Sequence, residues 1–98
     1  MRQKSLTKET VIRRELSTDG TNAFEYELIM RESERVASYG IPLYSISVRM
    51  IDERGHATEG EIRDAFADAG KALILFEKIV RNLATPIDLA YIHEDEMR

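Results

Sequence analysis

Two segments of the chain alternate apolar and polar side chains with a period of two residues. In residues 23–32 the apolar face consists of Phe24, Tyr26, Leu28 and Met30, and the other face of Glu25, Glu27, Ile29 and Arg31. In residues 42–51 the apolar face consists of Tyr44, Ile46, Val48 and Met50, and the other face of Ser45, Ser47 and Arg49. This period predicts two strands, each with one buried face and one face in water.

The segments beside these strands carry weaker signals. Residues 6–16 are rich in Thr, Val and Ile. Leu6, Thr10, Ile12 and Leu16 all lie at even positions, as on one face of a strand. The turn residues of 17–22 and of 52–56, where Gly55 permits a positive φ, predict two hairpins. Gly40 and Pro42 predict a bend or an edge position in the third strand, since proline lacks a ladder donor.

Residues 57–67 fit two structures. Thr58 and Glu61 have the spacing of a capping box, which would start a long helix here. However, Gly60 is unfavourable in a first helical turn, and Gly60, Ile62, Asp64 and Phe66 also fit one face of a strand. Local chemistry alone leaves both possibilities open.

A broad apolar stripe predicts a helix over residues 69–83. Its members recur at spacings of three and four: Ala69, Ala72, Leu73, Phe76, Ile79, Val80 and Leu83. Asp68 is the expected N-cap, and Ile74 and Leu75 lie outside the centre of the stripe. Thr85, Pro86 and Asp88 then predict a second, short helix over residues 86–94, anchored by Ile87, Leu89 and Ile92.

The second half of the chain resembles a family of small, uncharacterised bacterial proteins defined only as a domain of unknown function. The resemblance rests on Tyr39-Gly40-Ile41, Asp64-Ala65-Phe66-Ala67-Asp68, Thr85-Pro86-Ile87-Asp88-Leu89 and Glu94-Asp95. The chain departs from the family pattern at Phe66, where a hydroxyl residue is usual, and at Asp88, where a histidine is frequent. The resemblance implies a four-stranded sheet followed by a helix and a short second helix, and it implies no activity.

We therefore expect an α+β fold: a four-stranded antiparallel meander packed against one amphipathic helix, followed by a short C-terminal helix. The predicted core comprises Phe24, Tyr26, Leu28, Tyr44, Ile46, Val48, Leu73, Phe76 and Val80. Residues 1–98 are expected to form a single domain, because 98 residues leave no room for two.

Composition and charge exclude several classes of protein. The chain has no cysteine, which rules out disulfides, thiolate metal sites and cysteine nucleophiles. The formal net charge is −4, and the half from residue 50 onward carries six Lys and Arg against eleven Asp and Glu. A basic cluster occurs only near the start, at Arg2, Lys4, Lys8, Arg13 and Arg14. Nucleic-acid binding is therefore not expected. No apolar run approaches a membrane span and no secretory signal is present, so we predict a cytoplasmic protein.

No residue pattern predicts catalysis. His56 lies in a turn without a nucleophile nearby, and His93, Glu94 and Asp95 are consecutive, so their side chains point in different directions. Glu25 and Glu27 are expected to be solvated on a polar strand face, and Phe24, Tyr26 and Tyr44 to pack in the core. We predict no catalytic, cofactor-binding or metal-binding residues, no cofactor, and no enzymatic activity.

Protein association is the leading functional hypothesis. A sheet covered by helices on one face leaves the other face open, with Ile29, Leu43 and Ile51 on it, and Tyr39 beside the Gly40–Pro42 segment. The open face or a sheet edge could form a homodimer or bind another protein. The alternative is a small-molecule binding domain with a pocket between the sheet and the C-terminal helix.

Overall fold

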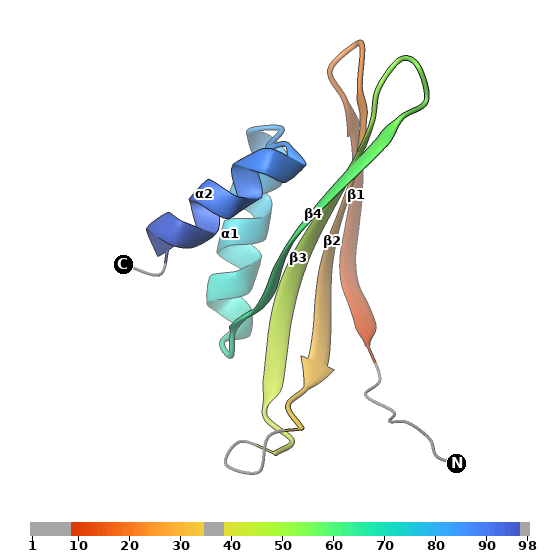
Figure 1. Ribbon diagram of the computed structural model, residues 1–98. Coiled ribbons are helices and arrows are strands. Elements are labelled where there is room, and N and C mark those ends of the chain that lie inside the picture. Colours follow the sequence, from red (N-terminus) through yellow and green to blue (C-terminus); the bar gives the residue numbers. More distant parts are fainter. Residues whose placement is uncertain (1–8, 35–38, 97–98) are drawn as a thin grey trace, which may run out of the picture.

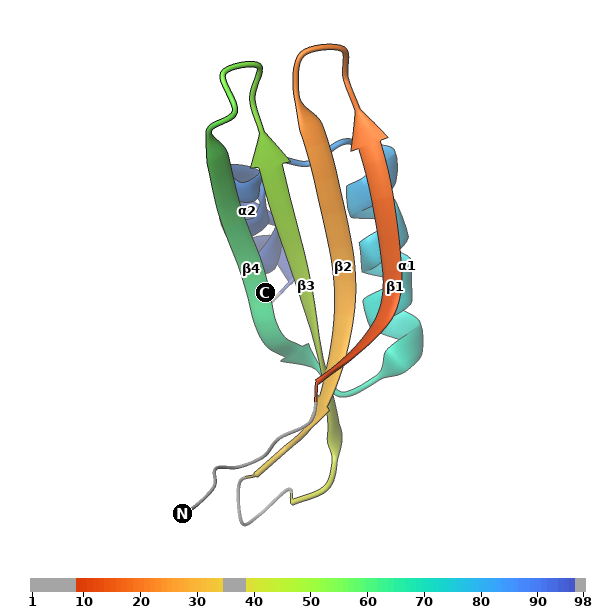
Figure 2. The same ribbon diagram turned by 90° about the vertical axis from the view of Figure 1, so that its right-hand side faces the viewer.

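The computed structural model describes residues 9–34 and 39–96, with side chains as far as Ile92. Its elements are β1 (Thr10–Thr18), β2 (Ala23–Glu32), β3 (Pro42–Ile51), β4 (Ala57–Phe66), α1 (Ala69–Arg81) and α2 (Pro86–Glu96). The strands form one antiparallel sheet in the order β1-β2-β3-β4. Both helices lie on one face of this sheet (Figure 1), and no described element covers the other face (Figure 2). The predicted α+β meander is confirmed.

Residues 57–66 form a strand, as the family resemblance implied. Gly60 lies at the point where α2 approaches β4. A Cβ at this position would be 2.5 Å from the carbonyl oxygen of Pro86 and 2.9 Å from its Cα, closer than such atoms can approach. Glycine therefore allows the first turn of α2 to pack against the strand.

The hairpins form where the turn residues predicted them. The Asp19 Oδ1 accepts hydrogen bonds from the backbone N–H groups of Thr21 (3.0 Å) and Asn22 (2.7 Å). Asp52 plays the same role in the β3–β4 turn, where Gly55 has φ +86°. Each carboxylate stabilises its turn by pairing with otherwise unbonded amides.

The edge alternative for the third strand is wrong, because β3 lies between β2 and β4. The strand begins at Pro42, whose register partner is Glu32. The bend lies ahead of it at Gly40, which has φ +85° and donates its backbone N–H to the Ser33 carbonyl at 2.9 Å.

Both helices begin at their predicted caps. The Asp68 carboxylate accepts from the N–H groups of Gly70 and Lys71, and Thr85 and Asp88 form the reciprocal bonds of a capping box. α1 ends at Arg81, two residues before the predicted end, because Leu83 takes φ +51° and the Ala84 N–H bonds back to the Ile79 carbonyl. α2 runs two residues beyond the predicted residue 94.

The core lies between the sheet and the helices. Six of the nine predicted core residues are buried; the other three, Tyr44, Leu73 and Val80, are half-buried and pack against them. The buried set also includes Ile62, Leu75, Ala84 and Leu89, which the predicted core omitted. Leu75 is 4% exposed although it lies outside the centre of the stripe, whereas Ile74 is 69% exposed. Leu75 belongs to the buried cluster against which Phe66, at the end of β4, packs.

The apolar residues of β1 do not join this core. The register of β1 against β2 shifts between Val11 and Arg13, so the shared parity of Ile12 and Leu16 does not define a buried face. Arg13 instead points toward the helices, with its guanidinium carbon 5.7 Å from the centre of the Phe76 ring. Leu16 is 73% exposed.

Candidate functional site

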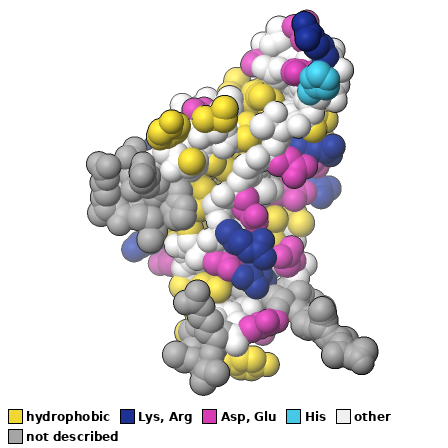
Figure 3. Space-filling model, in the orientation of Figure 1, with side chains coloured by type: hydrophobic (Ala, Val, Ile, Leu, Met, Phe, Trp, Pro, Cys, Tyr) yellow, Lys and Arg dark blue, Asp and Glu magenta, His cyan; other side chains and the backbone are white. Residues whose placement is uncertain are grey.

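The open face of the sheet carries charged side chains in cross-strand rows. One row follows the register Leu16, Glu25, Arg49 and Glu59, and the next follows Arg14, Glu27, Ser47 and Glu61. Directly opposed residues of antiparallel strands point to the same face, so each row brings its side chains together. Figure 3, which views the sheet along its β4 edge, shows basic and acidic side chains interspersed over the described residues on that side.

Two arginines pair with carboxylates across the strands. The Arg14 Nε donates to the Glu27 Oε2 at 2.9 Å and lies 3.4 Å from the Glu25 Oε2. The Arg49 Nε lies 3.6 Å from the Glu59 Oε2. The Glu27 hydrogen bond, followed by its charge, raises the pKa of the Arg14 guanidinium. These pairs hold the charged groups in a defined pattern on the surface.

A third ion pair joins β2 to the end of β4. Arg31 binds the Asp64 carboxylate with two nitrogens, one of them Nε at 2.9 Å from Oδ1. Asp64 has φ +51°, and its backbone N–H donates to the Oγ of the buried Ser45 at 2.8 Å. The Arg31 hydrogen bond and charge lower the pKa of the Asp64 carboxyl, against the opposing effect of burial. The pair fixes β4 where its register against β3 shifts.

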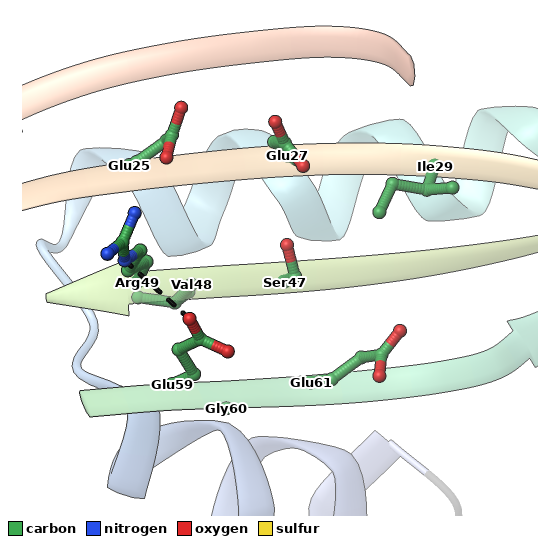
Figure 4. A pocket seen from close by; sticks show the side chains of 9 residues that line it. All are labelled: Glu25, Glu27, Ile29, Ser47, Val48, Arg49, Glu59, Gly60 and Glu61. Carbon is green, nitrogen blue, oxygen red and sulfur yellow. Dashed lines mark ion pairs between the residues drawn. The ribbon is translucent and has the colours of Figure 1, made fainter. Parts of the chain in front are cut away.

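The face is hollowed between the two glutamate pairs. The hollow has a volume of about 450 Å³ and is lined by Glu25, Glu27, Ile29, Ser47, Val48, Arg49, Glu59, Gly60 and Glu61. Figure 4 shows the Glu25 and Glu27 side chains on β2 and those of Glu59 and Glu61 on β4, with the short Ser47 side chain on β3 between them. A serine beside longer glutamates leaves space for a group from outside.

The sequence placed Ile29, Leu43 and Ile51 on this face, and the register confirms the placement. Glu25 and Glu27 lie on the open, polar face as expected, with side chains 36% and 21% exposed, and both are paired with Arg14. The partnership of Arg31 with Asp64 was missed, since 33 residues separate them. The signal for the face as a whole was the odd positions shared by its polar residues Glu25, Glu27, Arg31, Ser45, Ser47 and Arg49.

The predicted basic cluster is partly described. Arg2, Lys4 and Lys8 lie outside the described residues. Arg13 pairs with Glu15 at 2.9 Å and Glu77 at 3.6 Å. Arg14 and Arg13 are therefore both matched by carboxylates of the same chain.

His56 stands apart from the hollow. His56 is exposed in the β3–β4 turn, with its Nδ1 3.8 Å from the Asp52 Oδ2. His93, Glu94 and Asp95 lie in α2, and their side chains are outside the described part. Within the described residues, no three His, Asp or Glu side chains are arranged to hold a metal ion.

At the start of α2 the described junction between the sheet and this helix is closely packed. Gly60 meets the backbone of Pro86, and the buried Ile62 and Leu89 are part of the core here. A second hollow, of about 160 Å³, lies elsewhere, beside α1, between Phe66, Leu75 and two lysines. Among the described residues, no helix is both long and apolar enough to cross a membrane.

The chain belongs to a family of unknown function. The model of that family, DUF6514, matches residues 6–98 and so covers nearly the whole chain. The resemblance drawn from the second half of the sequence is thereby confirmed and extended to the first two strands. No curated protein and no solved structure matches the chain.

Proposed function

We propose that this chain is a non-catalytic protein-interaction module that binds a partner through the open face of its sheet. The observation that carries the proposal is the hollow on this face, whose charged walls are held in place by cross-strand ion pairs. Both helices pack on the opposite face, so the described fold leaves this surface accessible.

The charge of the face indicates the chemistry of the partner. Four glutamates line the hollow, against Arg49 inside it and Arg14 beside it, which leaves an excess of two negative charges. A partner surface that presents Lys or Arg side chains would complement this charge and be drawn to it during encounter. The hollow could accept one such side chain above Ser47, with Ile29 contacting its aliphatic part.

Binding without chemistry fits these side chains better than catalysis does. The glutamates of the hollow face Arg49, Ser47 and Ile29, and no histidine or lysine among the described residues lines the hollow with them. Glu25 and Glu27 are paired with Arg14, and Glu59 with Arg49, so three of the four carboxylates are engaged in ion pairs. We therefore assign the face to recognition.

Co-purification with matched variants tests this proposal. The tagged chain and the isosteric double variant Glu27→Gln/Glu61→Gln would be isolated from native cells, and retained proteins would be quantified by mass spectrometry. The control is Glu32→Gln/Glu53→Gln, which removes the same charge from two exposed positions off the open face. Denaturation curves of all three proteins would establish that the substitutions leave the fold intact.

We expect one protein to be retained stoichiometrically by the wild type and the control, and about tenfold less by the open-face variant. Equal retention by both variants would place binding on another surface. A preparation that carries a metabolite and no protein would favour the small-molecule alternative instead.

A further inference from the structure

We propose that β1 pairs antiparallel with β1 of a second copy of this chain, in a register centred on Arg14. The four-stranded sheet of each copy would then continue into the other. This proposal concerns the sheet edge and does not depend on what the open face binds.

The edge at β1 is exposed in both backbone and side chains. β1 is the outermost strand, and its outer backbone edge is not paired with any described strand. α1 contacts it through Arg13, which lies over Phe76 and pairs with Glu77. Its apolar side chains are exposed, with Val11 and Ile12 each at 46% and Leu16 at 73%. An edge strand of this kind is a ready template for another strand, and a second strand would cover these side chains.

The sequence of β1 is complementary to itself when two copies pair over their full length. In that register Thr10 faces Thr18, and Ile12 faces Leu16 of the second copy. Arg13 faces Glu15 of the second copy, and two-fold symmetry makes each contact occur twice. The pairing thus places Arg13 opposite Glu15, which have opposite charges, and Ile12 opposite Leu16, which are both exposed and apolar.

The residue on the symmetry axis does not oppose this pairing. Arg14 would face its own counterpart, and two unpaired arginines there would repel. Each Arg14 is already bound to Glu25 and Glu27 of its own chain. Arg13 and Glu15, which already form a 2.9 Å pair within the strand, would become a network of four alternating charges on the helix side of the joined sheet.

The opposite edge is less suited to such pairing. In β4 the register shifts near its end and Asp64 adopts a left-handed conformation, with its side chain bound to Arg31 of β2. The backbone there departs from the extended form that a second strand requires. The irregularity in β1 is confined to Ile12, near one end of the proposed pairing, and the register from Arg13 to Thr18, which includes the Arg13 and Glu15 contacts on both sides of the axis, is continuous.

Light scattering and cysteine cross-linking test the proposal. Wild-type protein from about 10 μM to about 1 mM should show a mass twice the 11.3 kDa of one chain as the concentration rises. Because the chain has no cysteine, single cysteines report the register directly. The variant Arg14→Cys places its two thiols directly opposite each other, with Cβ atoms about 5 Å apart, close enough for a disulfide.

The matched control is Thr18→Cys, at the end of the same strand. In the proposed register its two thiols lie eight residues apart along the strands, about 26 Å. We expect Arg14→Cys to form disulfide-linked dimer at least about tenfold faster than Thr18→Cys under mild oxidation. A wild-type mass of one chain throughout the concentration range would overturn the proposal, as would equal cross-linking of the two variants.

Charge exchange gives a second measurement. Arg13→Glu and Glu15→Arg should each weaken self-association about tenfold, because like charges then face each other twice. A mixture of these two variants should restore dimerisation, since every facing pair is again of opposite sign. Failure of the mixture to associate, with both variants folded, would contradict the register. Loss of the open-face partner in the co-purification experiment would leave these results unchanged, so the two proposals fail separately.

Discussion

Gly60 on β4 faces the backbone of Pro86 at the start of α2, with no space for a side chain between them. The contact lies beside the buried Ile62 and Leu89 and joins the last helix to the edge of the sheet. Both partners belong to elements held elsewhere, β4 by its pairing with β3 and α2 by its capping box. Neither can move alone to accept a methyl group.

Gly60→Ala should therefore destabilise the protein by about 1–3 kcal/mol, the usual cost of overpacking. Chemical denaturation measures the change. The control is Gly70→Ala, whose added Cβ would meet only the side-chain oxygen of Asp68, at 3.2 Å. That variant should stay within about 1 kcal/mol of wild type, because the neighbour is flexible and alanine favours the helix. Equal effects of the two substitutions would show that the Gly60–Pro86 contact is not restrictive.

The buried hydroxyl of Tyr26 donates a hydrogen bond of 3.0 Å to the carbonyl of Ala84, in the connection between the helices. Tyr26→Phe keeps the ring but leaves this carbonyl without its donor. We expect a loss of about 1–3 kcal/mol in the free energy of unfolding. Tyr91→Phe, at a side chain that is 65% exposed, is the control and should leave stability unchanged.

The same hydroxyl predicts a dependence on alkaline pH. Burial, followed by the charges of Asp19 and Asp88, raises the pKa of Tyr26 from 10.0 to about 12. Between these values the unfolded chain loses the proton first, so the wild-type protein loses stability as the pH rises from 10 toward 12. Denaturation at about pH 9 and about pH 11 should show a smaller fall in Tyr26→Phe than in wild type. Identical pH dependence would contradict the assignment.

Local patterns were sufficient to predict most elements. The period of two located β2 and β3, and the side chains of Asp68, Thr85 and Asp88 located the helix starts, because capping depends on residues within one turn. Residues 57–66 were different. Glycine is needed at position 60 because the backbone of Pro86, 26 residues later, lies against it. No local sequence rule predicts that contact.

The charged face was predicted only in outline. Parity placed Glu25 and Glu27 on the side opposite the core, but their pairing with Arg14 depends on the register of β1, which shifts at Ile12. Likewise, Leu75 is buried in the core cluster although it lies outside the centre of the apolar stripe, so helix periodicity alone does not predict its burial. The sequence predicted the elements but not the contacts between them.

Phe76 tests the central core assignment. Its side chain is fully buried, and the guanidinium of Arg13 lies over its ring. Phe76→Ala should destabilise the protein by about 3–5 kcal/mol, through lost burial and the cavity left behind. Ile74→Ala, two residues earlier on the exposed side of α1, should change stability by less than about 0.5 kcal/mol. A loss below about 1 kcal/mol for Phe76→Ala, measured by denaturation, would overturn the assignment.

The Arg31–Asp64 pair predicts a dependence on acid pH. Asp64→Asn preserves a residue type that tolerates positive φ but removes the charge, so it separates the ion pair from the backbone conformation. We expect a loss of about 1 kcal/mol at neutral pH, because the pair is only partly buried.

The pKa of the Asp64 carboxyl is lower in the folded protein than its ordinary value of 3.8, chiefly because Arg31 donates hydrogen bonds to it. Its contribution to stability is therefore complete above that value and is lost as the pH falls through the lower folded value. Urea denaturation across this range should show the difference between wild type and Asp64→Asn shrinking as the pH falls. The control Glu53→Gln, at an exposed turn position, should show no such convergence. If the difference in stability between the two proteins stays constant into strong acid, the charge of Asp64 is not what stabilises the fold.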